Sequence, residues 1–212
     1  MKGIKWTTVR AVASATFLIV ACDNAYAGQT PTEERALHRF GQAVSEYARL
    51  HQQLERSLPP LEVTDDMEAL YEVIDALADR IREARSHARE GDIFDPAVSH
   101  FLRIRIQAAL RDHQIEVGEL LADIMAEVPP GTERPRVNER FPWEWGAAVP
   151  LCVLEVLPEL PEDLEYRFAG RDLVLVDMHA ELVVDIMFGA LPPIPMGVLT
   201  SVWKEPTEWR SQ

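Results

Sequence analysis

The chain has few residues of the kinds that hold thiolate metal sites, disulfide frameworks or nucleic acids. Only two of its 212 residues are cysteine, Cys22 and Cys152, which excludes a disulfide scaffold and a zinc site built from several thiolates. Lys and Arg number 21 against 35 acidic residues, a net charge of −14 at pH 7. Because phosphate binding needs clustered basic residues, we expect no nucleic-acid partner.

Sequence motifs of familiar enzymes are also missing. The chain has no Gly-rich phosphate loop, no nucleophile elbow and no dinucleotide fingerprint. A pair of adjacent acids, Asp65 and Asp66, has the position of a helix N-terminus rather than that of an acid–base pair. These absences favour a non-enzymatic protein, and we predict no catalytic residue and no cofactor.

Histidine is present, but not at the spacing of a helical metal site. The six histidines are His38, His51, His87, His100, His113 and His179. No two of them are separated by four residues, so no helix offers a ready-made zinc or nickel face. His87 and His100 could approach each other across a turn, and His179 lies in a predicted turn close to Asp177 and Glu181. We expect His179 to be a solvated turn residue, and the sequence predicts no metal ligand.

The N-terminus has the three parts of an export signal in order. A basic stretch at residues 2–10 precedes the apolar run 11–21, which is too short to span a bilayer. Small residues then lead to a predicted cleavage site after Ala27, which would make Gly28 the first residue of the mature chain. Loss of this segment leaves 18 basic and 34 acidic residues, a net charge of −16.

A second processing site competes with the first. The segment Ile19–Cys22 resembles the lipobox of bacterial lipoproteins, in which the cysteine is acylated and becomes the first residue. Asp23 would then resemble an inner-membrane retention signal. We therefore predict an exported protein that is either periplasmic or anchored by lipid on Cys22, with no other membrane contact.

Residues 28–130 are predicted to form a helical region. Apolar residues recur there at spacings of three and four. The predicted helices run from Thr32 to Ser57, from Thr64 to about Ala88, from Pro96 to about His113, and from Val117 to Val128. The first two are joined by a short connection, which predicts an antiparallel hairpin. In the first helix His51 fills a gap in an otherwise apolar stripe.

Residues 149–190 are predicted to form a small antiparallel meander. Its strands are Leu164–Phe168, Leu173–Val176 and Leu182–Met187, with the first turn at Gly170. The second and third strands are apolar on both faces, so both faces need cover. We expect the helical region on one face, and either the C-terminal tail or a second molecule on the other.

Two less regular segments flank the meander. Residues 131–148 are polar and proline-containing, as in a surface linker, and carry the aromatic run Phe141–Trp145. Its two tryptophans either plug the seam between packed elements or stack on a ligand. Cys152 follows in apolar surroundings, which predicts a buried, inert thiol. Residues 191–212 form a Pro-rich tail that either wraps the meander or is taken up by a partner.

The meander also carries a resemblance to known proteins. The resemblance rests on the residues Tyr166, Gly170, Asp172, Leu173–Asp177 and Leu182–Asp185. This pattern resembles the C-terminal β element of small exported bacterial proteins of the RcnB type, a family linked to nickel and cobalt homeostasis. The chain has Ala180 and Glu181 where that family usually has a Gly turn. With Phe141–Trp143 and Gly146–Ala148 included, the stretch also resembles a group of uncharacterised exported bacterial proteins. The resemblance implies the shape of the element and no metal function.

The sequence therefore predicts an α+β fold in which three or four helices pack on a small antiparallel meander with an extended tail. The first functional hypothesis is an exported, non-enzymatic cell-envelope protein that acts through contacts with a protein partner or in a homodimer. The alternative is a periplasmic protein that binds a metal or small cation, suggested by the RcnB-like element and the charge of −16.

Overall fold

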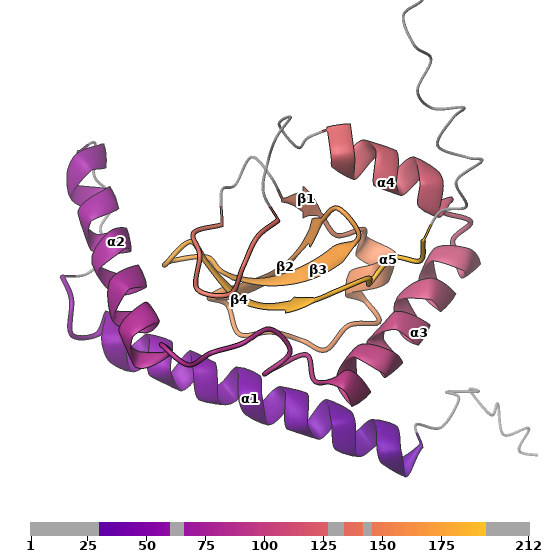
Figure 1. The fold of residues 1–212 in the computed structure, drawn as a ribbon, viewed down its shortest axis with the longest axis horizontal. Coiled ribbons are helices and arrows are strands. Elements are labelled where there is room, and N and C mark those ends of the chain that lie inside the picture. Colours follow the sequence, from indigo (N-terminus) through magenta and orange to yellow (C-terminus); the bar gives the residue numbers. More distant parts are fainter. Residues whose placement is uncertain (1–29, 60–65, 127–133, 142–145, 194–212) are drawn as a thin grey trace, which may run out of the picture.

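The computed structural model describes residues 30–59, 66–126, 134–141 and 146–193, and all observations below concern these residues. The helices are α1 (Pro31–Glu55), α2 (Met67–Ala84), α3 (Pro96–Asp112), α4 (Val117–Ala126) and the short α5 (Leu151–Leu154). The strands are β1 (Ala147–Ala148), β2 (Leu164–Ala169), β3 (Asp172–Asp177) and β4 (Leu182–Met187). The protein is α+β, as predicted, with its helices around a small antiparallel sheet (Figure 1).

Side-chain caps set the starts of the three long helices. The Thr30 hydroxyl accepts a hydrogen bond from the first turn of α1, and Asp95 does the same for α3 with Pro96 at the first helical position. Helix α2 begins after Asp66, whose carboxylate is the N-cap. The sequence predicted a start at Thr64, and the observed N-cap lies two residues later.

Helix α2 packs through its C-terminal half only. Its buried residues are Leu77, Ala78 and Ile81, whereas Met67 and Tyr71 are 51% and 45% exposed. Figure 1 shows the N-terminal half rising away from the sheet. The apolar stripe that the sequence predicted along the whole of α2 is therefore buried only in the C-terminal half of the helix.

The sheet has the strand order β1-β2-β3-β4, and every neighbouring pair is antiparallel. The predicted meander is confirmed in strands β2 to β4, and β1 adds a short strand that the sequence did not predict. Gly170 has a φ of +59°, as its turn requires. In the β3–β4 turn Glu181 has a φ of +49°, at a place where the RcnB-type element that the sequence resembles usually has glycine. That turn is held instead by the Asp177 carboxylate, which accepts hydrogen bonds from the backbone N–H groups of His179 and Ala180.

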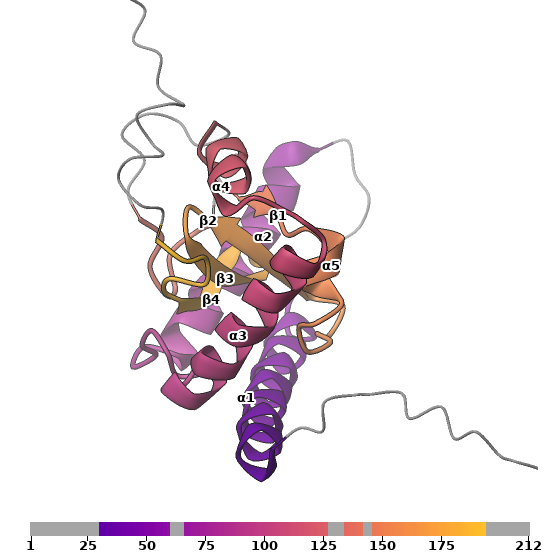
Figure 2. The same cartoon turned by 90° about the vertical axis from the view of Figure 1, so that its right-hand side faces the viewer.

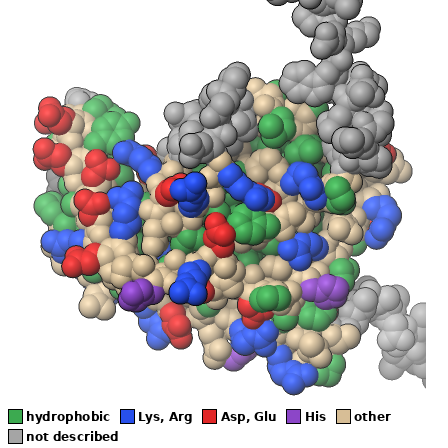
Figure 3. All heavy atoms as spheres, viewed as in Figure 1, with side chains coloured by type: hydrophobic (Ala, Val, Ile, Leu, Met, Phe, Trp, Pro, Cys, Tyr) green, Lys and Arg blue, Asp and Glu red, His purple; other side chains and the backbone are tan. Residues whose placement is uncertain are grey.

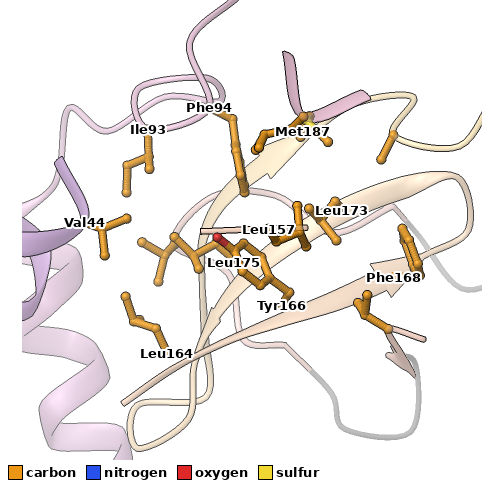
Figure 4. Close-up of a cluster of buried hydrophobic side chains, with 14 of the residues drawn as sticks. Val44, Ile93, Phe94, Leu157, Leu164, Tyr166, Phe168, Leu173, Leu175 and Met187 are labelled. Atoms are coloured by element: carbon orange, nitrogen blue, oxygen red, sulfur yellow. The ribbon is translucent and has the colours of Figure 1, made fainter. Parts of the chain in front are cut away.

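One face of the sheet packs against the helices. Tyr166 and Leu175 lie opposite each other in the β2–β3 register and contribute to the same apolar cluster as Val44 of α1 and Phe94 of the α2–α3 connection (Figure 4). Helices α1 and α3 run along this side of the sheet (Figures 1 and 2). The predicted cover of this face by the helical region is confirmed.

The opposite face is covered by a segment other than the predicted ones. Residues 134–141 lie along β4, where backbone hydrogen bonds join Asn138 to Val183 and Phe141 to Glu181. The Phe141 side chain is fully buried. Its apolar cluster contains Val174, Val176, Val183 and Ile186, with Val137, Ala169 and Phe188 packed against it. Part of the predicted surface linker thus closes the face for which we expected the tail or a second molecule.

Several sequence-based predictions fall outside the described residues. These are the processing sites at Cys22, Ala27 and Gly28, the tryptophan pair, and the tail from residue 194. Cys152 is described, and it is a free, buried thiol as predicted. None of the described helices combines the length and the apolar character that crossing a membrane requires.

Candidate metal centre

The C-terminal half of α1 directs three polar side chains to one place. Tyr47, His51 and Glu55 follow one another at intervals of four residues, which puts them on one face of the helix. Tyr47 and His51 are buried within the apolar stripe of α1, and Glu55 is the last residue of the helix. All three contact residues at one end of the β2–β3 pair and in the β3–β4 turn.

The sheet register brings the other residues to the same place. Leu164, the first residue of β2, pairs with Asp177, the last residue of β3. The backbone N–H of Met178 donates to the carbonyl of Asp163 at 2.9 Å. Asp163, Asp177 and His179 therefore lie together at one edge of the meander, opposite the C-terminal turns of α1.

Asp177 holds this region together. Its side chain is fully buried. One carboxylate oxygen accepts the Tyr47 hydroxyl and the Nδ1–H of His51, both at 2.6 Å. The other oxygen accepts the backbone N–H groups of His179 at 3.0 Å and Ala180 at 2.8 Å. Burial and the neighbouring Asp177 raise the pKa of Tyr47 well above its usual value, so that its hydroxyl stays a donor.

His51 has one nitrogen in use and one unused. Its ring is fully buried and Nδ1 is bonded to Asp177, but Nε2 has no hydrogen-bond partner among the described residues. The nearest carboxylate oxygen of Glu55 lies 3.6 Å from Nε2. Burial lowers the pKa of His51, but the hydrogen bond to Asp177 and the surrounding acids outweigh burial, and the net shift is upward. A buried, unpartnered ring nitrogen is costly unless something else binds it.

His179 faces His51 across a short gap. The two ring centroids are 5.7 Å apart. Nδ1 of His179 lies 2.9 Å from a carboxylate oxygen of Glu55 and 3.7 Å from one of Asp163. The His179 side chain is 44% exposed, so this histidine lies at the surface while His51 is buried behind it. His179 was predicted to be a solvated turn residue. It does lie in the turn and is partly exposed, but it also pairs with His51.

These side chains form a group with the dimensions of a metal site. One ligand atom each of His51, Asp163 and His179 can be chosen so that all three lie within 4.8 Å of one another. Ligands of one tetrahedral ion, each about 2.0–2.2 Å from it, are about 3–3.5 Å apart, so a small side-chain movement would complete the site. Glu55 borders the same space and could supply a fourth ligand.

The sequence had placed the histidines differently. His87 and His100 are both exposed, and neither belongs to the group described above. The pair that does approach, His51 and His179, is separated by 128 positions in the chain, so no local spacing reveals it. The available signal was the polar His51 within an apolar stripe, followed four residues later by Glu55.

Comparison with protein-family models, with curated proteins and with solved structures finds no match to this chain. The fold and the site thus define an α+β protein with a histidine–carboxylate centre between a helix and a β-turn. The resemblance of strands β2 to β4 to the RcnB type stays a prediction.

Proposed function

We propose that the protein binds a divalent transition-metal ion between the C-terminal end of α1 and the β3–β4 turn. The observation that carries the proposal is the buried Nε2 of His51, which has no hydrogen-bond partner and lies 3.6 Å from the Glu55 carboxylate that Nδ1 of His179 also contacts. One ligand atom each of His51, Asp163 and His179 lies within 4.8 Å of the others. A metal ion would use this lone pair and both neighbouring side chains at once. This proposal corresponds to the metal-binding alternative of the sequence-based hypotheses.

The ligand set indicates the class of ion. Two imidazoles with one or two carboxylates suit zinc and its neighbours in the first transition row, whereas calcium and magnesium take oxygen ligands. Cys152 is not part of the group, so soft thiolate-binding ions are not favoured. We propose further that the ion is met outside the cytoplasm, in line with the predicted export signal. Histidine and carboxylate ligands suit that oxidising setting, since neither forms disulfides.

Metal titration tests the proposal. We expect purified, chelator-treated protein to bind zinc, cobalt, nickel or copper with a stoichiometry of one, and to give no heat with calcium or magnesium in calorimetry. His179→Ala and Asp163→Asn each remove a ligand at the partly exposed side of the site, and we expect each to weaken binding at least about tenfold. Both residues lie outside the apolar core, so the variants should fold.

Matched variants control for the loss of any histidine or acid. His113→Ala and Asp112→Asn change exposed residues at the end of α3, away from the proposed ligands. We expect both to bind metal as the unchanged protein does. An unchanged protein that binds none of the four ions, or ligand variants that bind as tightly as the controls, would contradict the proposal.

Action through protein contacts, in a homodimer or with a partner, is the second proposal. The two apolar faces of the meander support it less than we expected, because the chain itself covers both of them. Its remaining support is the N-terminal half of α2, where Met67 and Tyr71 are exposed. Light scattering across a wide concentration range tests the homodimer, and a protein that stays monomeric throughout contradicts it.

Several of the charged side chains that the structure describes are paired with one another or with backbone carbonyls. On the face shown in Figure 3, basic and acidic side chains are interspersed. Arg134 pairs with Asp172, and Arg140 pairs with Glu181 at 2.5 Å. Arg85 and Arg103 donate to backbone carbonyls of β4 and the residues that follow it. These arginines hold the chain segments of the protein together, and we assign them no ligand.

A further inference from the structure

The buried carboxylate of Asp177 determines more than the stability of the β3–β4 turn. A carboxylate only accepts hydrogen bonds, so the 2.6 Å contact with Nδ1 of His51 requires the proton of the neutral ring to be on Nδ1. Nε2 is then the bare nitrogen with the lone pair. This is also the nitrogen that has no hydrogen-bond partner, and it lies 3.6 Å from the Glu55 carboxylate that His179 contacts with its Nδ1.

The same carboxylate also sets the position of the second histidine. Its other oxygen accepts the backbone N–H of His179 and of Ala180, which fixes the start of the turn. One buried side chain therefore orients the ring of His51 and the backbone of His179. In metal sites a carboxylate of this kind typically holds the far nitrogen of a ligating histidine.

We infer that Asp177 is the positioning residue of the site: it holds His51 in the Nδ1–H tautomer, so that Nε2 is ready to bind a divalent transition-metal ion together with His179. This inference rests on the proposed function. Tyr47 donates to the same carboxylate oxygen and contributes to its orientation, but it does not touch the unused nitrogen of His51.

The substitution Asp177→Asn separates this role from a structural one. The amide can donate to Nδ1 of His51, and the ring then moves its proton to Nε2 and loses the lone pair on that nitrogen. The opposite amide orientation would set its NH2 group against the two backbone N–H groups of the turn, which disfavours it. We expect zinc or cobalt affinity to fall by about 10–100-fold, as for other outer residues of metal sites.

The matched control is Tyr47→Phe. It removes one hydrogen bond from the same buried oxygen but leaves the contact between Asp177 and Nδ1 of His51 in place. We expect this variant to keep the Nδ1–H tautomer and to lose much less affinity than Asp177→Asn. If Asp177 had only a structural role, the loss of metal affinity in Asp177→Asn and in Tyr47→Phe would be proportional to the loss of stability in each variant. The tautomer of His51 would then be the same in both variants as in the unchanged protein.

Long-range proton–nitrogen NMR spectra of the imidazole rings report the tautomer directly, in the unchanged protein without metal and at a pH above the raised pKa of His51, where the ring is neutral. A protonated Nδ1 and a bare Nε2 on His51 are expected, and zinc should shift the Nε2 resonance. A proton on Nε2 in the unchanged protein overturns the inference, even if Asp177→Asn does not fold. So does a folded Asp177→Asn protein with unchanged metal affinity. The expected tautomer without any metal binding overturns the proposed function but supports the control of the tautomer by Asp177.

Discussion

Replacing Phe141 with alanine is expected to lower the free energy of unfolding by about 3–5 kcal/mol, the usual loss for a buried phenylalanine. The Phe141 ring is fully buried against four apolar residues of strands β3 and β4. It is the largest side chain of the cluster on that face. Its removal leaves a cavity over the sheet that the short segment 134–141 has little means to fill. Urea denaturation measures the loss.

The packing around Phe141 supplies a sharper test. A Cβ atom at Gly146 would lie 2.5 Å from two ring carbons of Phe141. We therefore expect Gly146→Ala to destabilise the protein when Phe141 is present, and much less when position 141 is alanine. The double-mutant cycle measures this coupling. Ile104→Ala, which changes an exposed residue of α3, is the control and should have little effect. Additive effects at 141 and 146 would show that the two residues are not in contact.

Asp185→Asn is expected to lower the free energy of unfolding by about 3 kcal/mol, although it only replaces one carboxylate oxygen with an NH2 group of similar size. Asp185 is a fully buried residue of β4. One carboxylate oxygen accepts the N–H groups of Gly91 and Ile186, and the other accepts those of Ile93 and Phe94, all at 2.7–2.8 Å. Burial raises the pKa of this carboxyl, and the four N–H donors oppose that shift.

An asparagine cannot accept all four of these hydrogen bonds. In either orientation its NH2 group faces two backbone donors, which are then buried without a partner. The connection between α2 and α3 would loosen, and Phe94 with it, because this loop is tied to β4 through Asp185. Urea denaturation of Asp185→Asn beside Asp112→Asn, an exposed control, measures the effect. A loss equal to that of the control would mean that the four contacts do not hold the loop.

Local patterns were sufficient for most of the secondary structure. The spacing of apolar residues placed helices α1 to α4 within a few positions of their observed bounds, and the start of α3 at Pro96 was predicted to the residue. The short apolar runs and the turn residues between them placed strands β2 to β4 almost residue by residue, and Gly170 permits the positive φ of the first turn. These features depend on residues that are close together in the chain, so the sequence alone is sufficient to predict them.

The cover of the second sheet face was not predicted, since the composition of residues 131–148 is that of a surface linker. Nothing in a short polar, proline-containing segment shows that Phe141 is buried under β3 and β4 or that the backbone of residues 138–141 pairs with β4. That outcome depends on which apolar surface remains open after the helices have packed, and this is decided only in three dimensions.

The amino-acid sequence by itself determined the α+β class, the periodicity of the helices, the meander and the acidic charge, because each follows from local spacing or from composition. Only the tertiary structure decided the candidate metal centre. His51 and His179 become neighbours when α1 packs across the end of β2 and β3, and Asp177 then accepts two hydrogen bonds from α1 in addition to two from its own turn. Burial is also decided by the tertiary structure. The Nε2 atom of His51 lacks a hydrogen-bond partner only because the fold excludes water from it.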